Sequence, residues 1–192
     1  MNRNVSVEGV DHSTHLPDYT ETTPESFKKQ LLNLSSSYLN LKDALVATNS
    51  IEAQKAINEV SASLAKIDMS LLKGEAHDFW MEQLGAMQTH SEKIAASDKI
   101  EEQRAQFDFL SQALIKSVKV FGIGEATLYV QHCPMANDNN GADWLSAQES
   151  IKNPYFGDQM LTCGSIKTTI DATFKNPMMP KASKAQPNLH NH

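Results

Sequence analysis

Four consecutive segments of this chain carry apolar residues at alternating spacings of four and three, and this pattern constrains the fold most. The segments run from Phe27 to Leu45, from Ala53 to Leu71, from His77 to Ile94 and from Ile100 to Phe121. On an α-helix this spacing gathers the apolar side chains on one face, which must be buried. Short connections make successive helices antiparallel neighbours. We therefore expect a mainly α protein built on an antiparallel, up-and-down four-helix bundle.

The local sequence predicts where these helices begin and end. We expect helices over about 24–48, 51–73, 75–96 and 98–121. Thr23 followed by Pro24 is typical of an N-cap with proline in the first turn, and Asn49 or Ser50 is suited to cap the second helix. Gly74 is the expected C-cap that ends it.

After residue 124 the helical periodicity stops, and the last quarter of the domain is expected to be loop-rich with a small β element. Residues 126–131 are β-branched or aromatic with rough alternation and predict a strand, which a second short strand within 161–170 would pair with. Residues 137–141 are typical of a turn. For residues 142–150 we expect a short helical turn, with Trp144 and Leu145 packing inwards.

Composition suggests one domain with two polar ends. Residues 1–23 are predicted to be a flexible arm, residues 24–174 the bundle with its C-terminal segment, and residues 175–192 a disordered tail. A net charge of −6 argues against nucleic acid or an anionic membrane as the partner. No apolar run reaches the ~20 residues that span a bilayer, so no membrane span is expected.

Both cysteines of the chain lie in the C-terminal segment, each close to a methionine. Pro134 favours extended geometry at Cys133, which would project Cys133 and Met135 to one face and His132 to the other. Met160 and Cys163 are three residues apart, close enough to meet on one turn. Two thiols and two thioethers are a soft ligand set suited to Cu(I).

Other assignments of these residues remain open. Zinc is the alternative ion, bound by the two cysteines and a histidine, with His132 the lesser candidate ligand. His77, His90 and Met81 are further residues that could join such a site. Alternatively, the two cysteines form a disulfide and the methionines only fill the core. No nucleophile or phosphate-loop motif is present, so we do not expect an enzyme.

The C-terminal motifs resemble a known family. The resemblance rests on Gln131-His132-Cys133-Pro134-Met135-Ala136, Gly141-Ala142-Asp143-Trp144-Leu145, Asn153-Pro154-Tyr155-Phe156-Gly157 and Met160-Leu161-Thr162-Cys163-Gly164, with Trp80, Arg104, Phe107 and Leu110-Ser111 in the helical part. They are similar to a bacterial domain family of unknown function, found fused to or encoded beside CusB-type periplasmic adaptor subunits of heavy-metal efflux pumps.

This resemblance implies a periplasmic domain linked to copper or silver, but it supplies no ligand list. The first residues contain no apolar signal core, so we expect either a cytosolic protein or a mature form without its export signal, and the resemblance favours the mature form. The first functional hypothesis is a Cu(I)- or Ag(I)-binding domain for efflux or homeostasis. The second is a structural or protein-interaction domain with a Cys133–Cys163 disulfide, whose partner is an efflux adaptor or membrane component. We further expect Arg104 to reach carbonyl groups or a carboxylate of the C-terminal segment.

Overall fold

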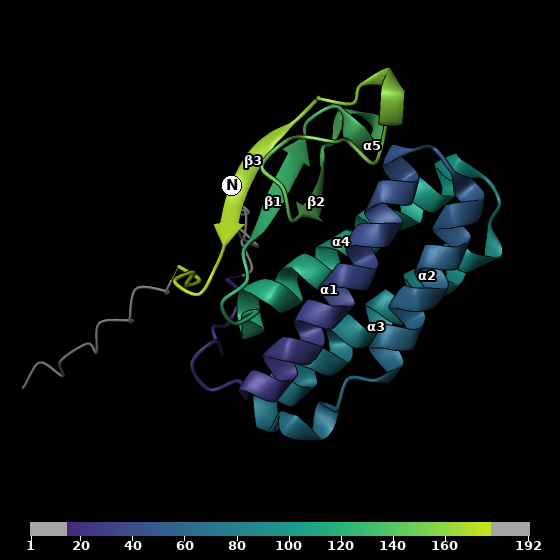
Figure 1. Cartoon of the computed structure of the whole chain (residues 1–192). Coiled ribbons are helices and arrows are strands. Elements are labelled where there is room, and N and C mark those ends of the chain that lie inside the picture. The colour runs from purple at the N-terminus through teal and green to yellow at the C-terminus, as the bar shows by residue number, and fades with distance from the viewer. Residues whose placement is uncertain (1–14, 178–192) are drawn as a thin grey trace, which may run out of the picture.

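The structure is a computed structural model that describes residues 15–177. Its four long helices are α1 (Glu25–Val46), α2 (Ser50–Ala65), α3 (Gly74–Ala96) and α4 (Ile100–Phe121). Each packs against the next along the chain, and α1 also contacts α4 (Figure 1). A small three-stranded sheet follows these helices. A mainly helical protein with a small C-terminal β element is therefore confirmed.

The second helix is shorter than the apolar pattern predicted. It ends at Ala65, and a 3₁₀ turn, η1 (Met69–Leu71), follows it. The Asp68 side chain accepts a hydrogen bond from the Ser70 backbone at 3.0 Å, which stabilises this turn instead of further helix. Ile67 and Leu72 are nevertheless buried, which shows that the connection after α2 also packs on the core. The apolar pattern therefore continues beyond the end of the helix. Gly74, the expected C-cap, instead begins α3.

The sheet consists of β1 (Leu128–Cys133), β2 (Ala142–Ser146) and β3 (Ser165–Ile170). The central strand β1 pairs antiparallel with both neighbours, in the order β2-β1-β3. The sequence predicted that a strand over 126–131 pairs with a short strand within 161–170, and the pairing of β1 with β3 confirms this. The helical turn expected at residues 142–150 is wrong, because the first half of that segment pairs along β1 as a strand. Trp144 and Leu145 are fully buried, as predicted.

Tyr38 joins the sheet to the helices. Its ring stacks on Phe107 with centroids 5.0 Å apart, and its hydroxyl lies 2.6 Å from Ser111 Oγ. The same hydroxyl accepts a hydrogen bond from the Leu145 backbone at 3.2 Å. One buried side chain of α1 thus contacts both α4 and β2, which places the C-terminal segment on the helices.

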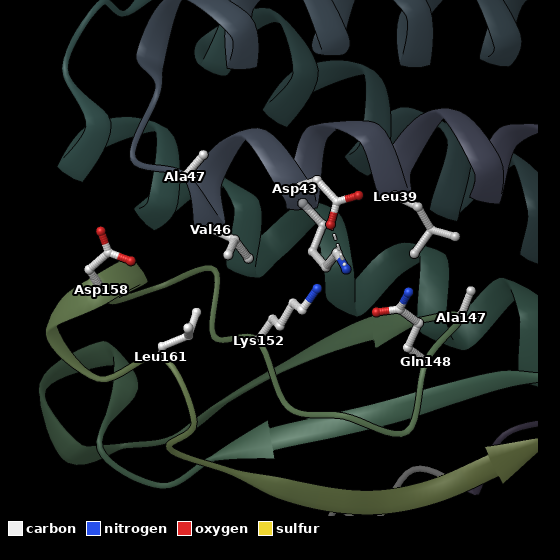
Figure 2. A pocket seen from close by; sticks show the side chains of 10 residues that line it. Leu39, Asp43, Val46, Ala47, Ala147, Gln148, Lys152, Asp158 and Leu161 are labelled. Carbon is white, nitrogen blue, oxygen red and sulfur yellow. Dashed lines mark ion pairs between the residues drawn. The ribbon is translucent and has the colours of Figure 1, made fainter.

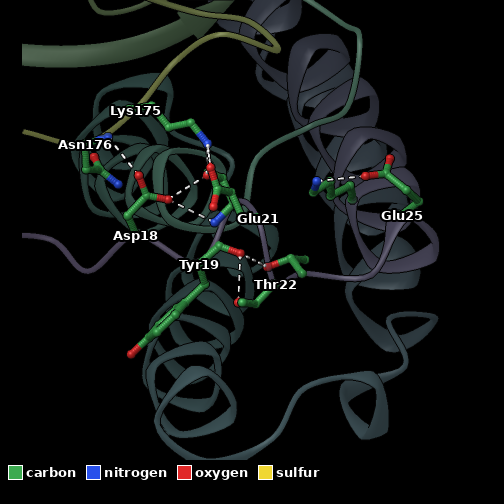
Figure 3. Close-up of polar contacts among 10 residues, drawn as sticks. Asp18, Tyr19, Glu21, Thr22, Glu25, Lys175 and Asn176 are labelled. Carbon is green, nitrogen blue, oxygen red and sulfur yellow. Dashed lines mark hydrogen bonds and ion pairs between the residues drawn. The ribbon is translucent and has the colours of Figure 1, made fainter.

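The segments at both ends of the described chain pack on the end of α4. The Tyr19 backbone donates to the Val120 carbonyl at 2.9 Å, and the Asn176 amide donates to the carbonyls of Lys119 at 2.9 Å and Pro17 at 3.0 Å. Figure 3 shows Asp18, Lys175 and Asn176 meeting here. The Lys119 and Val120 carbonyls lie in the last turn of α4, which leaves its carbonyls without partners inside the helix.

The extent of the two polar ends therefore differs from the prediction. Residues 15–23 belong to the packed structure, although the sequence predicted a flexible arm through residue 23. Residues 175–177 are packed too, through Asn176, which is buried. The remainder of the predicted arm and tail, residues 1–14 and 178–192, lies outside the described residues.

We predict that Asn176→Ala lowers the free energy of unfolding by ~1–3 kcal/mol, because two carbonyl groups lose their donor in a buried place. Urea denaturation measures the change. Asn40→Ala is the control, since the Asn40 amide contacts only the exposed Glu59 at 3.3 Å, and it should change stability little. Equal stabilities for the two variants would show that the Asn176 contacts contribute nothing.

Within residues 15–177, the helices are all too short or too polar to cross a bilayer.

Candidate functional site

The two cysteines meet in space although thirty residues separate them. Cys133 is the last residue of β1 and is buried, whereas Cys163 lies just before β3 and is half-buried. Their sulfur atoms are 3.1 Å apart, and both are free thiols. The Cys163 backbone donates to the Met160 carbonyl at 3.1 Å, and the Asn153 side chain donates to the Cys163 carbonyl at 2.9 Å. Pairing of β1 with β3 therefore brings the thiols together.

The sulfur contact suits both chemistries that the sequence left open, which are a metal ion bound by two thiolates and a disulfide bond. Two thiolates on one tetrahedral zinc ion, each at ~2.3 Å, lie ~3.8 Å apart, and a disulfide bond is ~2.05 Å long. The observed separation of 3.1 Å lies between these values. The hydrogen bond to Cys133, and then burial, raise the pKa of the Cys163 thiol.

The two methionines line one groove, and neither Cys133 nor Cys163 is among its lining residues. The groove has a volume of about 620 Å³ and is formed by α4, by α5 (Ala136–Asn139) and by residues 155–160. Met135 is 47% exposed in it, and Met160 is half-buried. Phe109 and Phe156 provide apolar walls, and the carboxyl-bearing residues are Glu101, Asp108 and Asp138. We call this surface the methionine groove.

A strained turn forms one rim of the methionine groove. Asn137, Asp138 and Asn139 have φ values of 54°, 54° and 64°, which is the left-handed region. Asn and Asp tolerate this conformation better than other non-glycine residues, so the sequence prediction of a turn here is confirmed. Gly141 closes the turn, and a Cβ at this position would lie 2.7 Å from His132 Cε1. The turn thus fixes the chain directly after Met135.

His132 does not lie with the cysteine pair. Its Nδ1 is 2.6 Å from Asp143 Oδ1 on the neighbouring strand, and Asp143 Oδ2 accepts from Lys167 Nζ at 2.8 Å. Cys133 is buried on the core side of β1, and alternation along the strand sends His132 to the other face. The candidate ligand His132 is therefore not brought to the two thiols.

The other residues considered as additional ligands lie elsewhere. Residues 15–177 contain no cluster of three or more His, Cys, Asp and Glu side chains that could hold one metal ion. The Nδ1 of His90 is 2.8 Å from Gln106 Oε1, and its ring stacks on Phe109 at 4.7 Å. The His77 side chain is partly exposed beside Asp78, and Met81 is exposed on α3. In the described part of the chain, the cysteine pair thus has no histidine partner for zinc.

Arg104 holds the loop that carries the second half of the motif. Its Nε donates to the Pro154 carbonyl at 2.8 Å, and Nη2 donates to the Leu45 carbonyl and to Thr48 Oγ1, both at 2.9 Å. The prediction that this side chain reaches carbonyls of the C-terminal segment is confirmed. Because Arg104 also lines the methionine groove, it links the end of α1 to the site.

Sequence reasoning missed the acidic and aromatic residues that α4 contributes to the groove. Burial, helped by the nearby Asp143, raises the pKa of Asp108, while a hydrogen bond from Gln112 opposes this effect. Phe109 is 48% exposed on the same helix. The signal in the sequence was Phe109, an aromatic residue beside the apolar face of the fourth helix. This signal did not indicate which other segment would lie next to Phe109.

Comparison with known proteins identifies one similarity. Residues 34–126 match the model of a family described as "Protein of unknown function (DUF3347)". The match covers α2, α3, α4 and much of α1, and it ends before the cysteine and methionine motifs. No curated protein and no solved structure matches the chain. The helical part of this protein is therefore similar to a domain of unknown function.

Proposed function

We propose that this protein binds a soft metal ion, Cu(I) or Ag(I), through the thiolates of Cys133 and Cys163. Met135 and Met160 are the additional thioether donors. The observation that carries the proposal is the 3.1 Å contact between the two sulfur atoms. Met135 and Met160 follow Cys133 and precede Cys163 closely in the chain, and both line one groove. All four donors are sulfur atoms, and such a set favours Cu(I) over harder cations. The role is binding, with no catalysis.

The surroundings suit a cation that arrives through the methionine groove. Glu101, Asp108 and Asp138 line it, and the net charge of −6 favours the approach of a positive ion. Arg104 also lines the groove, but hydrogen bonds to two carbonyls and a hydroxyl hold its guanidinium in place. Cysteine binds a soft metal ion as the thiolate, so metal binding releases protons. Zinc is the weaker alternative, because His132 faces away.

The cellular setting belongs to the same proposal. The resemblance of the motifs to domains beside efflux adaptors supports a periplasmic location, with an adaptor or membrane component of a metal efflux system as the partner. The four long helices then serve as an antiparallel up-and-down bundle that presents the C-terminal segment.

A second candidate function is a structural or protein-interaction domain with a Cys133–Cys163 disulfide. The same sulfur contact favours it, because the atoms need to approach by only ~1 Å to reach bonding distance. Under this alternative, an efflux adaptor is still the partner, and the methionines only pack.

One experiment separates the two functions. Protein purified without reductant is treated with a thiol reagent in denaturant, before and after removal of bound metal by a chelator. The metal-binding function predicts two reactive thiols and one Cu(I) bound per chain in anaerobic titration. The structural function predicts no reactive thiol until a reductant is added. Two free thiols with no Cu(I) uptake would contradict both.

A further inference from the structure

A second cavity, separate from the methionine groove, lies between α1 and residues 147–161. It has a volume of about 460 Å³. Its walls include Leu39, Val46 and Leu161, and its polar side chains are Lys42, Asp43, Gln148, Lys152 and Asp158. None of the four sulfur residues lines it. Figure 2 shows side chains from both segments facing one another across this space.

Lys42 places a positive charge in this cavity at an unusual depth. Its side chain is only 6% exposed. An ammonium group has three N–H donors, and the one carboxylate within ion-pair distance in the described chain is Asp43, at 2.8 Å. Asp43 is itself 66% exposed. Asp43 uses only part of this donor capacity, so N–H groups of Lys42 remain for water or for a ligand in the cavity.

A second ammonium group points to the same place. Figure 2 shows Lys152 extending across the cavity towards Asp43, with Gln148 beside it and Asp158 at the far end. Within residues 15–177, Lys152 forms no ion pair. The lining carries two ammonium groups and two carboxylates, but Asp158 lies at the far end. Asp43 is therefore the carboxylate of the lining that lies beside Lys42, Lys152 and Gln148.

We propose that this cavity is an anion-binding site, in which an oxyanion lies between the ammonium groups of Lys42 and Lys152. The ligand is inorganic phosphate or the carboxylate of a small organic acid, since both present oxygen acceptors to ammonium donors. Gln148 can donate from its side-chain amide. The apolar walls at Leu39 and Leu161 favour an acid with a short hydrocarbon part. Such a ligand connects α1 directly to the loop that carries Met160 and Cys163.

The test is isothermal titration calorimetry of the full chain at low ionic strength, with inorganic phosphate and with butyrate. Sodium chloride at equal ionic strength is the control for non-specific screening. The variants are Lys42→Met and Lys152→Met, which keep most of the hydrocarbon chain and remove the charge. Lys55→Met is the matched control, because Lys55 is exposed, pairs with Glu52 and does not line the cavity.

We expect saturable binding with one site per chain for at least one of the two anions. Each cavity variant should weaken it at least tenfold, and Lys55→Met should leave it unchanged. Stronger binding of butyrate identifies an organic acid as the ligand class, and stronger binding of phosphate identifies an inorganic anion. Lys152 is exposed, so its variant remains informative if Lys42→Met does not fold. The proposal is overturned if the parent protein shows no saturable binding, or if Lys152→Met binds as tightly as the parent.

Discussion

Cys133→Ser and Cys163→Ser will each abolish tight Cu(I) binding, because either change replaces a soft thiolate with a hard, neutral hydroxyl. The two sulfur atoms are 3.1 Å apart. The chain has only these two cysteines, so no other thiol can take the place of either one. Met135→Leu and Met160→Leu keep volume and apolarity but remove a sulfur donor. Their affinity should fall by a smaller factor, and their stability should be retained.

Anaerobic competition with bicinchoninate measures this order of affinities. Met81→Leu is the control, since Met81 is an exposed methionine on α3 that does not line the methionine groove. For every variant that binds, affinity should also weaken as the pH falls, because protons compete with the metal ion for the thiolates. The raised pKa of the Cys163 thiol strengthens this competition. If both serine variants compete for Cu(I) as well as the parent does, the proposed site does not exist and the disulfide function replaces it.

Leu110→Ala will lower the free energy of unfolding by ~2–5 kcal/mol, the range found when a buried leucine leaves a cavity. Leu110 on α4 is 1% exposed and Leu34 on α1 is fully buried, and both belong to the hydrophobic core. Leu34→Ala should therefore have a similar effect. Urea denaturation under reducing conditions measures both.

Ile51→Ala is the control for these core variants, because the Ile51 side chain is 65% exposed on α2 and removing it leaves no cavity. Its effect should stay within ~0.5 kcal/mol. A melting temperature for Leu110→Ala that matches the parent within a degree or two would show that the predicted apolar face of the fourth helix does not form the core.

The sequence by itself determined the features that depend on periodicity and on local alternation. The spacing of Phe27, Leu31 and Leu34 requires a helix with one buried face, and all three are fully buried. Met135 does not share a strand face with Cys133 as predicted, because β1 ends at Cys133 and residues 134–135 form a turn. Alternation within β1 nevertheless correctly placed His132 on the opposite face from Cys133. These predictions succeeded because each depends on residues within one turn or one strand, where backbone geometry alone decides which side chains share a face.

Only the tertiary structure decided which distant groups meet. Residues 142–146 form a strand because β1 offers them a hydrogen-bonding partner, and Asn176 packs because the end of α4 offers unpaired carbonyls. The sequence suggested that Cys133 and Cys163 share a metal ion or a disulfide, but only the pairing of β1 with β3 brings their sulfur atoms to 3.1 Å. No local pattern indicated that Lys42 and Lys152 would line one cavity. Such contacts depend on the pairing of segments far apart in the chain, and their free energy appears only when both partners are in place.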